Sequence, residues 1–330
     1  MAKRTLIWIS GLVLLACATL TALLSGAADI GLRDVWAALA APHEAGANAA
    51  ILRDIRMPRV AAALVVGAAL ATAGAIMQGM TRNPLADPGL LGLTAGANAA
   101  LAFAIAFLPQ AGSFGLMLVC FAGAGVGSLL VFGVGALRRG GYSPVRIVLA
   151  GAAVSAFLYA LADAVGLMFR ISKNVSMWTA GGFIGATWDQ LAVVGPAIAA
   201  GLAAAMLFSK QLTILSLSEE VAVGLGQRTA WVKAALSAVV VLLAGASVAL
   251  AGSLAFAGLM VPHLARAVVG TDYRLVLPMS AIGGAALMAA ADTAARTVHA
   301  PFETPVAAVV AILGVPFFFF IVRRGGRAFA

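Results

Sequence analysis

Long apolar runs separated by short polar segments dominate the sequence. A helix needs about 20 predominantly apolar residues to cross a hydrocarbon core roughly 30 Å thick. Ten runs reach or approach that length, the weakest being the short eighth one, which contains Pro262. They cover Thr5–Leu24, Val60–Met80, Leu90–Leu108, Phe114–Gly135, Ile147–Phe169, Leu191–Phe208, Ala234–Ala251, Leu254–Val269, Leu275–Thr297 and Val306–Val322. The pattern predicts an all-α polytopic membrane protein with about ten transmembrane helices, forming a single domain over residues 1–330.

The composition supports a membrane protein and excludes the common alternatives. Hydrophobic residues make up 63% of the chain and charged residues 10%, whereas a soluble domain carries about 25% charged residues. A β-barrel is not expected, because the apolar runs are continuous and do not alternate with polar residues. The many Gly and Ala residues suit closely packed helices. Cys17 and Cys120 both fall inside apolar runs, where cysteine usually serves as a packing residue.

The net charge of +9 does not indicate nucleic-acid binding, because the basic residues lie in short clusters between apolar runs. With both termini in the cytoplasm, fourteen of the 21 basic residues fall in cytoplasmic segments, as the positive-inside rule expects. Four of the other seven crowd into the segment before the second run, namely Arg33, Arg53, Arg56 and Arg59. This local exception suggests a specific acidic partner on the outer side.

Motifs of common enzymes and metal sites do not occur in the sequence. There is no GxxxxGK[ST] loop, so the chain encodes no phosphate cradle for a nucleotide. The histidines His43, His263 and His299 lie in different segments, which argues against a metal site. We therefore expect no catalytic residues, no metal ligands and no cofactor.

One cytoplasmic segment, residues 209–230, has the signature of a short surface helix. Ser218 is a good N-cap residue, Glu219 and Glu220 would lie in the first turn, and Gly224 or Gly226 could end the helix. Such a helix could dock onto a partner, and the alternative is an ordinary connecting loop.

Further polar residues interrupt the apolar pattern at two places. Asn83 and Asp87 each precede a proline, so with Arg82 they predict a tight turn that caps the third helix, or else a gating element. Asp163 lies inside the fifth apolar run, where an ionisable residue normally faces a cavity or a partner. An interhelical hydrogen bond is the alternative for Asp163.

Several motifs in family order make the chain resemble the FecCD-type permeases, the membrane subunits of type II ABC importers for iron-siderophores, heme and vitamin B12. They are RMPR (56–59), QGMTRNPLADPGLLG (78–92), the turn 218–226, GLMVPHLAR (258–266), TDYRLVLP (271–278), ADTAAR (291–296), ETPV (303–306) and GVPFF (314–318). Ala307 is a departure, since the family often has Gly there. The resemblance implies the type II importer fold over nearly the whole chain.

The resemblance also implies roles for individual residues. Arg56, Arg59 and Arg296 match arginines that dock the substrate-binding protein through its carboxylates, although Arg296 could instead pair with Asp292 one turn earlier. A second set matches the coupling helices that insert into the ATPase subunit: Glu219, Glu220, Ala222 and Gly226. The fifth helix lines the translocation path in this family, which makes Asp163 a pore candidate.

The implied function is ATP-driven import of a bulky metal chelate across the bacterial inner membrane. The implied partners are a second copy of the permease, two cytoplasmic ATPase subunits, a periplasmic binding protein and membrane lipid. The PGLLG and TDYR segments rank the cargo as heme first, then ferric siderophore, then cobalamin. The alternative is an ion-coupled secondary transporter, which should carry several ionisable residues in discontinuous spans near the midplane.

Overall fold

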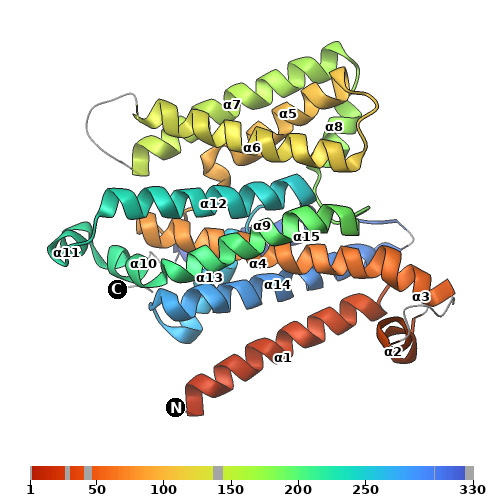
Figure 1. Cartoon of the computed structure of the whole chain (residues 1–330), viewed down its shortest axis with the longest axis horizontal. Helices are drawn as coiled ribbons and strands as arrows, with labels where there is room; N and C mark the ends of the chain where they lie inside the picture. Colours follow the sequence, from red (N-terminus) through yellow and green to blue (C-terminus); the bar gives the residue numbers. More distant parts are fainter. Residues whose placement is uncertain (1, 27–29, 41–46, 137–143, 301, 324–330) are drawn as a thin grey trace.

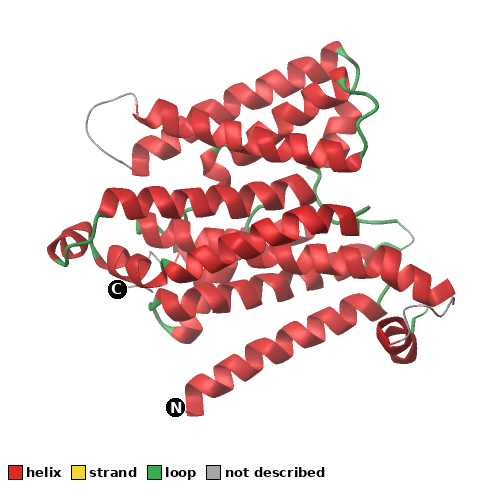
Figure 2. Cartoon of the chain, in the orientation of Figure 1, coloured by secondary structure: helices red, strands yellow, loops and turns green. Residues whose placement is uncertain are grey.

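Helices account for nearly all the regular structure in a computed structural model that describes residues 2–26, 30–40, 47–136, 144–300 and 302–323. No strand occurs in these ranges, as Figure 2 shows. The predicted all-α class is confirmed. His43 and four of the basic residues in the predicted cytoplasmic segments lie outside these ranges, namely Arg138, Arg139, Arg324 and Arg327.

Within the described ranges, seven helices are long and apolar enough to cross a membrane, and three shorter apolar helices accompany them. The seven are α1 (Ala2–Leu24), α4 (Met57–Thr81), α6 (Ser113–Ala136), α7 (Pro144–Met168), α9 (Trp188–Leu207), α12 (Thr229–Ala251) and α14 (Tyr273–Thr297). The shorter ones are α5 (Leu93–Phe107), α13 (Ala257–Val269) and α15 (Val306–Arg323). Together they coincide with the ten predicted spans.

Short helices lie between these spans. They are α2 (Leu32–Ala40), α3 (Ala47–Ile51), η1 (Leu52–Arg56), η2 (Pro88–Leu91), α8 (Ser172–Thr179), α10 (Ser209–Leu217) and α11 (Glu219–Gly224). The bounds of most predicted spans differ by a few residues from those of the helices; the seventh, for example, begins at Thr229 instead of Ala234. The third is divided into the 3₁₀ turn η2 and α5, because Gly92 adopts a left-handed conformation with φ +73°. The eighth begins at Ala257 instead of Leu254.

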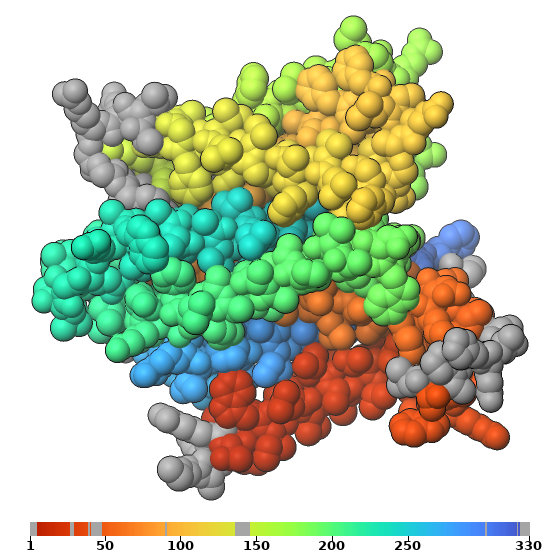
Figure 3. Space-filling view, viewed as in Figure 1, coloured from red at the N-terminus to blue at the C-terminus, as the bar shows by residue number. Residues whose placement is uncertain are grey.

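The central helix of the fold is α4, which packs against α14, α12, α13 and α9. In the most apolar 18-residue stretch of the span that contains α4, 78% of the residues are buried inside the chain, whereas the corresponding share for α1 is only 6%. Figure 3 accordingly shows α1 at the edge of the molecule, and its exposed apolar side chains suit contact with lipid. Helices α5, α6 and α7 form a separate layer, which lies on the side of α12 away from α4 and α14 (Figure 1).

Glycines allow the close approach of α4 to its neighbours. A Cβ atom added at Gly67 would collide with the backbone of Gly284 in α14, and one added at Gly74 would collide with Gly258 in α13. Small residues at such crossings allow dispersion contacts between backbones, which largely drive helix association in a membrane. Below, the two ends of the helix bundle are named after the first and last residues of α4, as the Met57 end and the Thr81 end.

Candidate functional site

The three predicted docking arginines converge at the Met57 end, and we call Arg56, Arg59 and Arg296 the arginine cluster. Arg56 ends the π-helical turn η1, Arg59 lies in the first turn of α4, and Arg296 lies in the last turn of α14. Rare π-helical turns often occur at functional positions. The structure thus brings together residues separated by more than 230 positions in the sequence.

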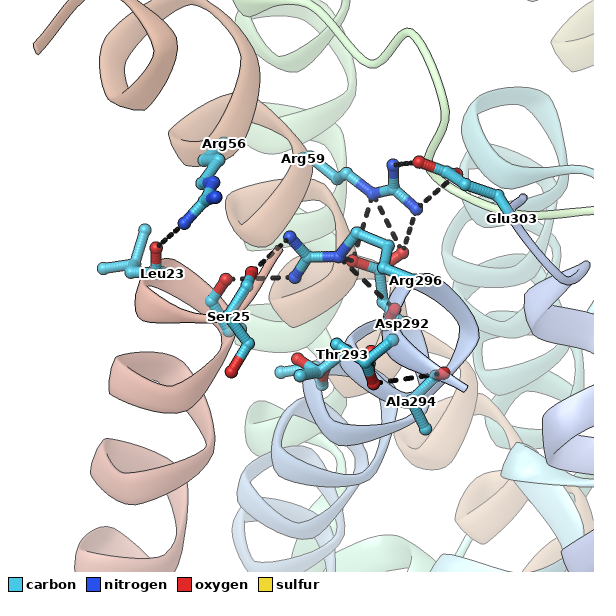
Figure 4. A network of polar contacts seen from close by, with 12 residues as sticks. Leu23, Ser25, Arg56, Arg59, Asp292, Thr293, Ala294, Arg296 and Glu303 are labelled. Carbon is cyan, nitrogen blue, oxygen red and sulfur yellow. Dashed lines mark hydrogen bonds and ion pairs between the residues drawn. The ribbon is translucent and has the colours of Figure 1, made fainter. Parts of the chain in front are cut away.

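Two carboxylates clamp Arg59. Its Nε and Nη2 donate to Asp292 at 3.0 and 2.9 Å, while its Nη1 and Nη2 donate to Glu303 at 2.8 and 2.9 Å (Figure 4). Asp292 belongs to α14, and Glu303 lies in the segment before α15. Such paired, charge-assisted bonds fix the orientation of the guanidinium.

Arg296 and Arg56 hold the C-terminal end of α1. Arg296 pairs with Asp292 at 3.1 Å and donates to the carbonyls of Ser25 and Ala22 at 3.2 and 3.0 Å. Arg56 donates to the carbonyls of Leu23 and Leu24 at 2.8 and 2.9 Å. The last carbonyls of a helix lack intrahelical partners and carry partial negative charge, so cations satisfy them well.

The arginine cluster is largely enclosed by the chain. Arg56, Arg59 and Asp292 are 4%, 7% and 0% exposed, while the Glu303 side chain keeps 35% of its surface exposed. The Arg296–Asp292 pair that the sequence offered as an alternative is present. Docking of a partner onto these arginines remains a prediction. Sequence reasoning missed Glu303 as the second partner of Arg59, although an acidic residue in the short segment before the last apolar run could have drawn attention to it.

The opposite end of the bundle carries the predicted coupling segment. Ser218 caps α11, because its hydroxyl accepts a hydrogen bond from the N–H of Val221 at 3.0 Å. Gly226, with φ +78°, follows the helix, as expected of a glycine at a helix end. The predicted short helix is therefore present, and it projects from the bundle beside α10 (Figure 1).

The four predicted coupling residues have different surroundings. Glu219 pairs with Lys233 of α12 at 2.7 Å, and Ala222 is fully buried, so these two residues attach α11 to the bundle. Glu220 is exposed, and a Cβ at Gly226 would meet open space. Sequence reasoning missed three apolar side chains that α11 and the following turn expose, namely Val221, Val223 and Leu225.

Hydrogen bonds lower the pKa of both glutamates. The pKa of Glu219 is lowered chiefly by the hydrogen bond from Lys233, and that of Glu220 chiefly by a bond from its own backbone N–H and next by Ser218. Because the folded pKa is depressed, the Glu219–Lys233 pair contributes its stabilisation above the ordinary pKa of glutamate. That contribution is lost as the pH falls through the lowered value.

The turn that joins α4 to η2 is built as the proline pattern predicted, with one difference. The side chain of Asn83 accepts from the N–H of Leu85 at 2.9 Å, and Asp87 accepts from Gly89 at 2.7 Å. Asp87 therefore caps the 3₁₀ turn and not α5, whose N-cap is Gly92. Arg82 ends α4 in a left-handed conformation and is exposed. Burial raises the pKa of Asp87, which lines a cavity of about 290 Å³ between this turn and α7.

Asp163 lies on α7 and is exposed at the surface of the chain. A charged side chain on a lipid-facing surface is costly, so this part of α7 should face water or a protein partner. No group of three or more metal-binding side chains occurs among the residues that the structure describes.

The fold defines the class of protein. A solved structure described as an inward-facing conformation of a metal-chelate type ABC transporter superposes with a TM-score of 0.84 at 25% identity, covering 97% of this chain and 99% of the other. The model of the FecCD transport family matches residues 13–324. The chain belongs to this family, and it is a permease subunit that is not itself an enzyme.

Curated relatives are permease proteins of several import systems. The iron(3+)-hydroxamate import system permease protein FhuB of Bacillus subtilis is 46% identical over 98% of this chain and 84% of its own length. The ferric enterobactin permease FepD of Escherichia coli is 39% identical over 96% and 94%, respectively. The hemin permease HmuU of Yersinia pestis is 37% identical over 95% and 94%.

Asp292 and Glu303 allow a matched test of the buried ion pairs. Asp292→Asn leaves two buried arginines without their shared charge, so we expect a loss of about 3–5 kcal/mol of stability. Glu303→Gln removes a charge from a partly exposed carboxylate and should cost about 1 kcal/mol or less. Thermal unfolding of the purified variants in detergent measures the difference. Equal losses of apparent midpoint in the two variants would contradict the assigned role of Asp292.

Proposed function

We propose that the chain is the membrane-spanning subunit of an ATP-driven importer for ferric chelates. This proposal rests on two polar sites that lie at opposite ends of one apolar helix bundle. They are the arginine cluster at the Met57 end and α11 at the Thr81 end. Such a layout suits a relay between an outer and an inner partner. The import systems named for its relatives support the same function.

The inner partner in this proposal is a pair of ATPase subunits. The exposed side chains Val221, Val223 and Leu225 give α11 an apolar tip, with Glu220 beside them. An amphipathic helix end of this kind fits a groove whose floor is apolar and whose rim is basic. Glu219 and Ala222 keep the tip attached to α12, so a force on the tip reaches the bundle.

The outer partner in this proposal is an acidic face of a substrate-binding protein. The arginine cluster holds three guanidinium groups against the two carboxylates of Asp292 and Glu303, so it keeps a surplus positive charge. The Nη1 and Nη2 atoms of Arg59 donate to Glu303, the more exposed of the two acids. A carboxylate of the binding protein could replace Glu303 there without disturbing Asp292. Docking through Arg56 and Arg296 would act on the carbonyl end of α1.

A second copy of the chain completes the pathway in this proposal. Asp163 and neighbouring exposed residues of α7 would then face the other copy or the water between the two, which removes the cost of a charge in lipid. The turn containing Arg82, Asn83 and Asp87 lies at the inner end of α4, where it could contribute to a gate.

The chain is a multi-pass protein of the bacterial inner membrane by its family and its apolar helices. We propose that the Thr81 end and both termini face the cytoplasm, following the distribution of basic residues. For the cargo, the comparisons do not favour heme over other ferric chelates. We place a ferric hydroxamate siderophore first, because that relative has the highest identity of those compared, and hemin second.

Reconstitution in vesicles tests the proposed function. The permease, its ATPase and its binding protein should take up a ferric hydroxamate only with ATP on the ATPase side, and the mass of the complex should fit two permeases and two ATPases. Hemin and a cobalamin serve as competing cargoes. Uptake driven by an ion gradient without ATP would favour a secondary transporter and contradict the proposal.

Neutralising Glu303 tests the outer docking face. Glu303→Gln frees one edge of Arg59 and increases the positive charge of the cluster, so the affinity for the binding protein should rise several-fold at low salt. The gain should shrink at high ionic strength, since exposed charges are screened. Asp189→Asn is the matched control, because Asp189 is exposed on α9 near the same end and has the same charge. If both variants bind equally well, the docking assignment fails.

A further inference from the structure

A proline leaves one carbonyl of α13 without its helical partner. Pro262 has no N–H group, so the carbonyl of Gly258, four residues earlier, cannot receive the usual helical hydrogen bond. The side-chain Nε2 of Gln78 in α4 donates to this carbonyl at 3.3 Å and to that of Leu259 at 3.2 Å. Because lipid offers no replacement, this amide fixes α13 to α4 in the turn before Pro262.

The other atom of the same amide leads to the far end of α13. The Oε1 of Gln78 accepts a short hydrogen bond from Nη2 of Arg266, which is 9% exposed and lies in the last turn of that helix. The guanidinium of Arg266 also interacts with the side chain of Tyr273, the first residue of α14. One buried polar chain therefore joins α4, α13 and α14.

The chain of contacts continues into the coupling segment. The hydroxyl of Thr213 in α10 accepts from the backbone N–H of Tyr273 at 3.0 Å and lies 3.3 Å from Oδ1 of Asp272. Its hydrogen can serve either Asp272 or the carbonyl of Ser209, which is 2.9 Å away. The Tyr273 ring packs directly on Gly79, so a side chain at position 79 would displace it. Five residues after Thr213, Ser218 caps α11.

We propose that this line of contacts transmits displacement of α10 and α11 to the turn of α13 around Pro262. Its members act as positioning residues for transport, in the order Thr213, Tyr273, Arg266 and Gln78. This assignment rests on the proposed function, because it gives the ATPase-facing segment a route into the bundle. Polar contacts suit the task, since in a low-dielectric interior they break only at high cost and therefore move as a unit.

The hydroxyl of Thr213 can be removed with little change of shape. Thr213→Val abolishes the acceptor for Tyr273, Thr213→Ser retains it, and Ser216→Ala is the control, because the Ser216 hydroxyl bonds only within α10, to the Thr213 carbonyl. In vesicles containing the full complex, Thr213→Val should lower the chelate imported per ATP hydrolysed by about fivefold, roughly the effect of one hydrogen bond. Thr213→Ser and Ser216→Ala should keep the wild-type ratio. A wild-type ratio for Thr213→Val would overturn the proposal, as would an equal loss in Ser216→Ala.

Hydrogen exchange provides a readout that requires no cargo. Binding of a non-hydrolysable ATP analogue to the complex should change the exchange of α13 amides around Pro262, and Thr213→Val should remove most of that change. Tyr273→Phe, which deletes the hydroxyl facing Arg266, should have the same effect. If wild-type vesicles import no chelate but these exchange differences appear, the cargo function fails and the linkage stands. Identical exchange in wild type and both variants refutes the linkage.

Discussion

The structure depends on one constraint, which is that polar groups inside a membrane must find their partners within the protein. Helix α4 shows how the chain meets it. Apart from Thr72, the middle of α4 is apolar, and it contacts α14 and α13 through glycines, with no room for a side chain between the backbones. Polar side chains occur near its ends, where Arg59 is paired with acids and Gln78 with backbone carbonyls. The most buried helix is thus also the one that connects the two polar sites.

This arrangement has a mechanical consequence. Arg59 and Gln78 lie about 28 Å apart along one helix, at 1.5 Å per residue. Arg59 is bonded to α14 and to the segment before α15, while Gln78 is bonded to α13. A rotation or shift of α4 at one end therefore acts on other helices at the other end. Packed helix interfaces tend to adopt one of a few discrete packing arrangements, so a small displacement of α4 can switch an interface from one arrangement to another.

Local patterns in the sequence were sufficient for much of the fold. Apolar run length predicted the spans, and Ser218 with its following glutamates predicted α11, because both signals lie within a few residues. The pairing of Arg59 with Glu303 spans 244 positions, and no local pattern reports which acid a buried arginine will meet. The same holds for Gln78 and Gly258, 180 positions apart. The sequence therefore drew attention to the arginines and to the Arg296–Asp292 pair one turn apart, but not to their distant internal partners.

The relay between the two membrane faces is the central claim, and ATP hydrolysis reports on it directly. The decisive measurement is the ATPase rate of the reconstituted complex with and without chelate-loaded binding protein on the outer side only. In the proposed arrangement the binding protein and the ATPase bind opposite faces of the permease, so any response must cross the membrane through the permease. We expect the loaded binding protein to raise the hydrolysis rate several-fold. A rate that is independent of the binding protein, at concentrations where it is shown to be bound, would contradict the account.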